Sequence, residues 1–202
     1  MIGKLSRAVA LTLVAAATAG SAFAETCALD DVTYGVDGLS GTTQNANGCK
    51  VLDGENDNAA LINTLGFGTT HQELARYDAP STSSSNNVYG FTWTLAPVSG
   101  TSGAWTLASN PVPNPALMLD LIIVIKASNA FAAYWFDDIS FDGSSGGEWT
   151  SIFINQNNKF QNISHMTAYD DAVVSRIPEP GSLALLGLAL AGVGVVRRRA
   201  SR

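Results

Sequence analysis

Apolar and polar residues alternate along the second half of the chain, and this alternation predicts β-strands. In residues 88–95, the bulky side chains of Tyr89, Phe91, Trp93 and Leu95 alternate with small or polar ones, which gives one apolar face. Stretches with strand character follow at 103–108, 132–141, 148–154 and 162–169. Short strands separated by Gly, Ser and Asn turns predict an all-β fold, an antiparallel β-sandwich with a jelly-roll-like arrangement.

Residues 117–126 are nearly all apolar, which predicts a central strand covered on both faces. All four tryptophans fall in predicted strands, so we expect them to pack in the core. The first part of the body is less regular, with one short predicted strand at 32–36. Residues 59–65 and 71–77 fit either a short helix or a strand. Polar turns or loops are predicted at 81–87 and 142–147.

Residues 1–24 have the three regions of a secretory signal peptide. Lys4 and Arg7 give a basic start, a short apolar stretch follows, and Ala-Phe-Ala at 22–24 predicts cleavage before Glu25. The alternative, an N-terminal membrane helix, fits less well because the apolar stretch is short and rich in alanine.

The C-terminal residues 177–202 combine three features. Pro178-Glu179-Pro180 predicts a stiff, extended spacer that proteases can reach, because proline fixes φ and has no amide hydrogen. An apolar run at 183–196 suits a membrane helix, and Arg197-Arg198-Arg199 forms a cytoplasmic stop. At about 1.5 Å per residue this run spans roughly 21 Å, less than the roughly 30 Å hydrocarbon core. A transient helix therefore fits better than the alternative of a permanent anchor.

The order of these features resembles the PEP-CTERM sorting signal of exported proteins from Gram-negative bacteria that make exopolysaccharide. The resemblance implies that a membrane-embedded exosortase recognises the tail and cuts near the Pro-Glu-Pro; Ile177 stands where valine is common. With the signal peptide, it predicts a precursor tethered transiently to the inner membrane through residues 182–196. The body, residues 25–176, would be one periplasmic domain that later reaches the cell surface or extracellular matrix.

The ends of the chain carry most of its positive charge. The full chain has 11 basic and 17 acidic residues, a net charge of −6. The predicted body keeps 5 basic and 16 acidic residues, a net charge of −11. Because such a surface repels nucleic acid and its Lys and Arg residues form no cluster, no nucleic-acid partner is predicted.

Cys27 and Cys49 both lie in the exported body, and an even count in an oxidising compartment predicts one disulfide. It would tie the mature N-terminus to the domain. The alternative, a pair of reactive thiols, is disfavoured because neither cysteine has a histidine or basic residue nearby in the sequence.

Neither histidine, His71 nor His165, belongs to a metalloprotease His-Glu-x-x-His motif. His165 alternates with Ile163 and Thr167 in a predicted strand, which favours a satisfied structural histidine over a catalytic one. No catalytic residue and no required cofactor are predicted.

Asp53, Glu55 and Asp57 bring hard oxygen ligands into one loop, which suggests calcium as a possible ligand. The loop does not follow the EF-hand pattern, because Asn58 and Thr64 stand where that pattern needs Gly and Glu. Asp137, Asp138 and Asp142 form a second acidic group around a predicted hairpin. Solvated turn acids are the favoured alternative for both groups.

These features predict a non-enzymatic, exported surface or matrix protein that is sorted through its tail. A carbohydrate-binding module is the first alternative, with exopolysaccharide as its ligand and exposed tryptophans as its expected sign. An exported hydrolase is the second alternative, and it would need His165 or a pair of acids facing a cleft.

Overall fold

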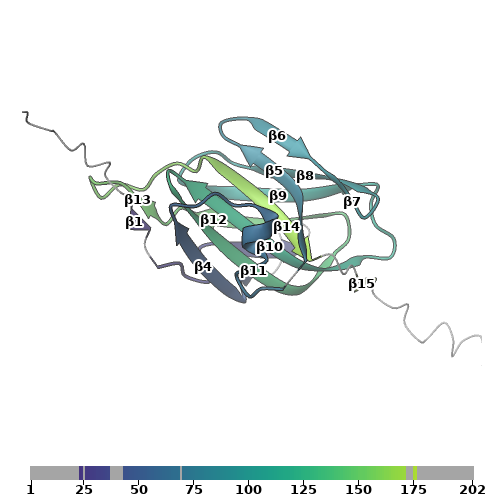
Figure 1. The fold of residues 1–202 in the computed structure, drawn as a ribbon. Coiled ribbons are helices and arrows are strands. Elements are labelled where there is room, and N and C mark those ends of the chain that lie inside the picture. Colours follow the sequence, from purple (N-terminus) through teal and green to yellow (C-terminus); the bar gives the residue numbers. More distant parts are fainter. Residues whose placement is uncertain (1–22, 25, 37–42, 69, 172–174, 177–202) are drawn as a thin grey trace, which may run out of the picture.

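The computed structural model describes residues 23–24, 26–36, 43–68, 70–171 and 175–176. Two antiparallel sheets pack face to face as a β-sandwich (Figure 1), which confirms the predicted fold class. The chain crosses between the two sheets repeatedly. Most of the predicted signal peptide and all of the predicted sorting tail, residues 177–202, lie outside the described residues.

The first sheet has the order β4 (Gly48–Asp53), β11 (Ala130–Phe141), β10 (Leu117–Ala127), β14 (His165–Asp171), β5 (His71–Asp78) and β6 (Thr82–Ser85). Strand β15 (Ser175–Arg176) also pairs with β10, at its first residues. The second sheet has the order β3 (Thr43–Asn45), β2 (Thr33–Val36), β12 (Ser144–Thr150), β9 (Ser102–Asn110), β8 (Phe91–Pro97) and β7 (Asn87–Val88).

A small separate sheet joins β1 (Phe23–Ala24) to β13 (Phe153–Ile154). This pair lies at one end of the sandwich and β15 at the other (Figure 1). Removal of the predicted signal peptide would therefore take β1 away from β13 and leave both large sheets intact.

The core between the sheets is built from the bulky residues that sequence periodicity placed on inner faces. Trp93, Trp105 and Trp149 are each at most 1% exposed, which confirms their predicted place in the core. The fourth, Trp135, is half-buried on the outer face of the first sheet and stacks on Phe67, with ring centroids 5.7 Å apart.

Strand β10 is buried on both faces, as its continuous apolar run predicted. One face contributes alternate residues to the main core, while Ile122 and Val124 point to the other side. There they pack under Ile62, Leu65 and Phe67. These three residues belong to the short helix α1 (Ala59–Ile62) and the loop after it. The stretch 59–65 thus contains a helix, and 71–77 falls in strand β5.

Three sequence predictions need correction. The stretch 88–95 is interrupted by a turn, because Tyr89 (φ 59°) and Gly90 (φ 82°) adopt left-handed backbone between β7 and β8. Alternation of side chains cannot reveal such a turn. The predicted polar loop 81–87 contains strand β6, which is exposed and pairs antiparallel with β5.

The predicted turn 142–147 is also too long, because strand β12 begins at Ser144. Gly146 and Gly147 lie within this strand and are needed for close approach. A Cβ added to Gly147 would lie 1.8 Å from the carbonyl oxygen of Thr33 on β2. These glycines are therefore required because neighbouring backbone lies too close for a side chain. The turn is confined to the residues before Ser144.

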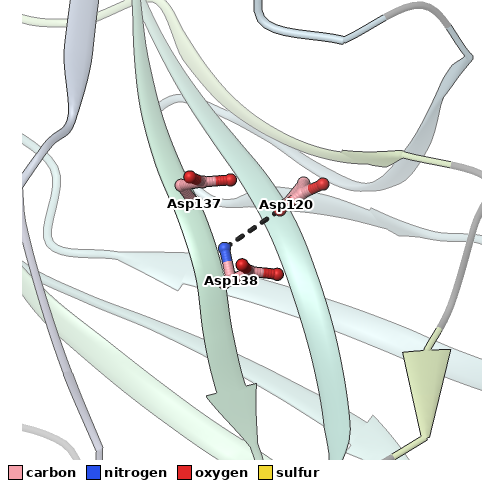
Figure 2. Close-up of side chains that lie close together, drawn as sticks. All are labelled: Asp120, Asp137 and Asp138. Carbon is pink, nitrogen blue, oxygen red and sulfur yellow. Dashed lines mark hydrogen bonds between the residues drawn. The ribbon is translucent and has the colours of Figure 1, made fainter.

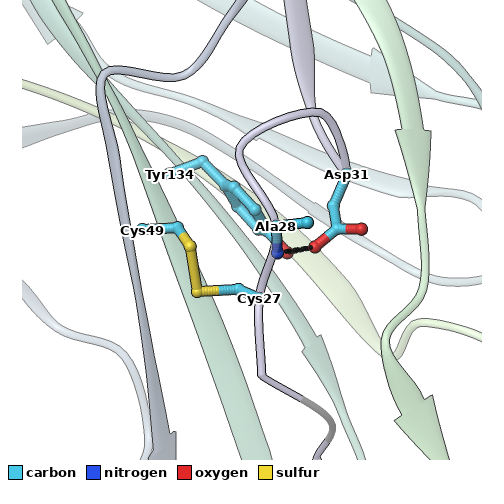
Figure 3. The surroundings of a disulfide bond; sticks show 5 residues. All are labelled: Cys27, Ala28, Asp31, Cys49 and Tyr134. Atoms are coloured by element: carbon cyan, nitrogen blue, oxygen red, sulfur yellow. Dashed lines mark hydrogen bonds between the residues drawn. A yellow bond between two sulfur atoms is a disulfide. The ribbon is translucent and has the colours of Figure 1, made fainter.

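The predicted disulfide between Cys27 and Cys49 is present, with Cα atoms 6.2 Å apart. It joins the segment before β2 to β4, the edge strand of the first sheet (Figure 3). Asp31 supports the same segment, since its Oδ2 accepts hydrogen bonds from the Ala28 amide and, at 3.1 Å, from the Tyr134 hydroxyl. The bond thus fixes the start of the body to an otherwise open sheet edge.

Among the described residues, no helix has the length and apolar character needed to cross a membrane. The predicted membrane segment, 182–196, lies outside the described residues.

Loss of the disulfide should destabilise the body. The bond closes a loop with a sequence separation of 22. In the chain-entropy model, releasing such a loop lowers the free energy of unfolding by about 3 kcal/mol. Urea unfolding of the oxidised protein and of the Cys27→Ala, Cys49→Ala double variant would measure this. Equal stabilities would show that the bond contributes nothing to the fold.

Candidate functional site

His165, the histidine weighed as a catalytic candidate, lies on β14 and is 5% exposed. Its Nδ1 lies 2.9 Å from the Arg76 guanidinium, and its Nε2 is hydrogen-bonded to Asp57 Oδ1. Because a guanidinium can only donate, Nδ1 accepts, and the ring proton sits on Nε2 and is donated to Asp57. Both ring nitrogens are occupied, which matches the prediction of a satisfied structural histidine.

Asp57 is the centre of this buried network. Its Oδ2 accepts hydrogen bonds from the hydroxyls of Thr167 at 2.8 Å and Tyr169 at 3.1 Å, and Arg76 approaches within 3.7 Å. Burial acts to raise the pKa of Asp57. Hydrogen bonds from His165 and Thr167, together with the charge of Arg76, outweigh burial and lower the pKa to about 2.

The network holds the loop between β4 and α1 on the outer face of the first sheet. Asp57 is anchored to β14, and Lys126 of β10 donates to the Glu55 carbonyl oxygen at 2.7 Å. Burial lowers the pKa of this lysine. Asp53 and Glu55 are exposed, whereas the Asp57 side chain is fully buried. The structure therefore does not bring the predicted calcium ligands Asp53, Glu55 and Asp57 together.

A different set of carboxylates converges on the first sheet. Ligand oxygens of Asp120, Asp137 and Asp138 all lie within 4.8 Å of one another (Figure 2). The pairing of β10 with β11 shifts register between Leu119 and Leu121, so two acids of β11 face one of β10. The Asp138 amide donates to Asp120 Oδ1 at 3.0 Å.

Sequence reasoning identified Asp137 and Asp138 but paired them with Asp142 and missed Asp120. A signal for Asp120 was available, because it is the one acid inside the apolar run 117–126. Desolvation raises the pKa of Asp137, and the charges of Asp120 and Asp138 raise it further. Hard oxygen atoms at this spacing suit a divalent cation, but exposed acids also gather without one, so the cluster alone assigns no metal.

Asp170 lies beside this cluster in a buried position. It is 1% exposed, and its Oδ1 accepts a hydrogen bond from the Asp120 amide at 2.9 Å. Burial raises the pKa of Asp170 to about 7, and the nearby charges of Asp120 and Asp171 add to the increase. The hydrogen bond from the Asp120 amide only partly opposes the increase. This carboxyl therefore titrates near neutral pH.

His71 on β5 is 3% exposed and is held by Asn63, whose Oδ1 lies 2.9 Å from its Nδ1. Burial lowers the pKa of His71, against the opposing effect of Asp171 and Asp120. Its Nε2 has no hydrogen-bond partner among the described residues. This arrangement favours the neutral imidazole.

Residues 143–147 have the Gly-x-Ser-x-Gly spacing of some hydrolase nucleophiles, a match that sequence reasoning overlooked. Ser145 is 1% exposed and lies within strand β12, which is paired on both sides by β2 and β9. A nucleophile of that type needs a strand-to-helix turn that exposes the serine, so the context does not fit.

The predicted sorting residues Pro178, Glu179 and Pro180, and the arginines Arg197, Arg198 and Arg199, lie outside the described residues. The body reaches almost to them, because Arg176 pairs with Leu117 in the first sheet. Comparison with known families gives one match, a model of the PEP-CTERM protein-sorting motif that covers residues 176–199.

The chain carries a PEP-CTERM sorting motif. This confirms the resemblance drawn from the Pro-Glu-Pro, the apolar run and the arginines. The PEP-CTERM motif implies processing by an exosortase and marks an exported protein that passes through the membrane. No curated protein and no solved structure matches the chain.

Replacing Asp57 should unfold the outer layer of the first sheet. Asp57→Ala leaves His165, Thr167 and Tyr169 without their acceptor, so the free energy of unfolding should fall by about 3–5 kcal/mol. Asp78→Ala is the matched control, since Asp78 pairs with the same Arg76 but is 47% exposed and should cost at most about 1 kcal/mol. Equal losses in the two variants would contradict a central role for Asp57.

The pH dependence of Asp57 gives a second readout of the same variant. Because the folded pKa, about 2, is below the ordinary 3.8, the stabilisation is present above pH 4 and is lost as pH falls toward 2. The loss should be about 2 kcal/mol in the parent protein and absent in Asp57→Ala.

Asp170 should have the opposite pH dependence. Its folded pKa of about 7 exceeds the ordinary 3.8, so stability should decrease as pH rises from about 4 to 7. Asp170→Asn should remove this decrease and be more stable than the parent at pH 8. Urea unfolding at pH 5 and pH 8 tests this, with Asp142→Asn, an exposed acid, as control. If the parent protein is equally stable at pH 5 and pH 8, the raised pKa of Asp170 is wrong.

Proposed function

We propose that this protein is a non-enzymatic component of the cell surface or extracellular matrix, delivered by its signal peptide and its PEP-CTERM tail. The observation that carries the proposal is the position of the motif. It begins at Arg176, the last described residue, which pairs with β10, so the sandwich would form the cargo of the sorting signal. Exosortase is the partner that this reading requires.

The chemistry of the body supports a structural or interaction role. His165 has both nitrogens in hydrogen bonds, and Ser145 is buried within a strand. His71, although its Nε2 has no hydrogen-bond partner among the described residues, is only 3% exposed. Hydrolase chemistry based on a histidine or a serine would need one of these groups beside a substrate, so this alternative takes third place.

Binding of exopolysaccharide takes second place. Sugar rings stack on exposed aromatic faces, but three tryptophans are at most 1% exposed, and Trp135 is stacked on Phe67. The three core tryptophans therefore offer no platform for a sugar ring, and Phe67 covers one face of Trp135.

Replacement of the tripeptide tests the sorting role. The triple variant Pro178→Ala, Glu179→Ala, Pro180→Ala keeps the apolar run and the arginines but removes the spacer. We expect it to accumulate as a full-length precursor in the inner membrane, while the parent is found beyond that membrane in a shorter form. Cell fractionation and intact-mass measurement report both properties.

The exposed body acid Glu148 provides a matched control, since Glu148→Ala removes one carboxylate without touching the tail. Its processing should equal that of the parent. If deletion of residues 177–202 changes neither the location nor the size of the remaining body, the tail has no sorting role.

A further inference from the structure

The described strands determine which end of the sandwich carries the tail. Ser175 and Arg176 pair with Met118 and Leu117, the first residues of β10. The loop 111–116, which connects β9 to β10, ends next to this pair. The sorting motif therefore leaves the body at the end that carries this loop, where Figure 1 shows β15.

The chain between the body and the predicted membrane segment is short. Six residues, 177–182, separate Arg176 from Leu183, the start of the apolar run. The seven Cα–Cα steps from Arg176 to Leu183 can span at most about 25 Å, even in a fully extended chain. While the tail is anchored, the end of the body with loop 111–116 is held near the membrane.

The opposite end of the sandwich lies farther from the attachment point of the tail. Strand β9 has 9 residues and separates loop 111–116 from Val98 by roughly 30 Å. Phe160, which bridges to Ile154, belongs to the same distant end, because the Ile163 amide is bonded to Gly100. An anchored tail would therefore hold an exposed apolar residue of the near end closer to the membrane than Val98 or Phe160.

Val112 is the exposed apolar residue at the near end. It is 66% exposed, more than Val98, Phe160 or Leu29, although it is surrounded by three prolines. The side chain of Val112 packs closely against Gly143, because a Cβ added to this glycine would lie only 2.8 Å from Val112 Cγ1. Proline has no amide hydrogen, so this loop loses fewer hydrogen bonds to water than an ordinary loop when it meets lipid.

We propose that, in the anchored precursor, loop 111–116 rests on the phospholipid bilayer with Val112 in the headgroup region. This rests on the proposed function only in that the tail must anchor the chain. The contact would orient the body in the same way on every precursor, with the β1–β13 end pointing away from the membrane. It would also hold the Pro-Glu-Pro close to the membrane surface, where a membrane-embedded protease acts.

The acidic cluster of Asp120, Asp137 and Asp138 limits the kind of lipid. Asp120 lies three residues beyond Leu117 on β10, about 10 Å from the pair formed with Arg176. An anionic bilayer would repel these carboxylates. The contact should therefore be stronger on phosphatidylcholine than on phosphatidylglycerol at low ionic strength, and the difference should shrink in salt.

A fluorescent probe at Asn114, an exposed neighbour of Val112, tests the contact. The precursor with Asn114→Cys would be purified from inner membranes of cells without exosortase, labelled, and placed in phosphatidylcholine nanodiscs containing a spin-labelled lipid. The native cysteines are joined, so the label reacts with the new thiol. We expect strong quenching at position 114 and little quenching of a probe at Val98→Cys.

Val112→Asp in the Asn114→Cys protein should reduce the quenching, while Val98→Asp, the matched change at the far end, should leave it unchanged. Equal quenching at positions 114 and 98, or no effect of Val112→Asp, would overturn the inference while the sorting role stands. Recovery of the precursor in the soluble periplasmic fraction would overturn both, because the tail would then not anchor the chain.

Discussion

Strand β10 is apolar on both faces, and the rest of the fold depends on covering it. The second sheet covers one face through the tryptophan-rich core, while α1 and the loop after it cover the other at Ile122 and Val124. A helix of 4 residues has no stability of its own, so this outer layer exists through tertiary contacts. Asp57 supplies the polar half of these contacts, because it fixes the loop before the helix to β14.

Two kinds of strand could be predicted from the sequence. A strand with one buried face shows alternation, as at Trp93 and Leu95, and a strand buried on both faces shows a continuous apolar run, as at 117–126. The errors have a common cause, since backbone conformation leaves little trace in hydrophobic periodicity. The turn at Tyr89 keeps the alternation intact, and the glycines of β12 have the composition of a loop although a close strand requires them.

Some of the candidate sites could be predicted from the sequence, and others depend on contacts between distant residues. The disulfide and the sorting motif could be predicted because their residues are specified by count, compartment or local order. The calcium hypothesis placed Asp57 in a solvent-exposed loop, but His165, which is 108 residues away, draws its side chain into the sheet. Asp120 joins Asp137 through strand register, and spacing along the chain contains no information about that register.

The distribution of charge links the fold to its export. The body has 5 basic and 16 acidic residues, and two of its basic side chains, those of Arg76 and Lys126, are committed to the network around Asp57. Few cations are left to balance the surface, so the predicted body would repel copies of itself and anionic membranes. In the proposed precursor, the short tether would oppose this repulsion and hold one end at the bilayer. Cleavage near the Pro-Glu-Pro would remove the tether and all four tail arginines at once, so the negative charge of the body would then favour departure of the product.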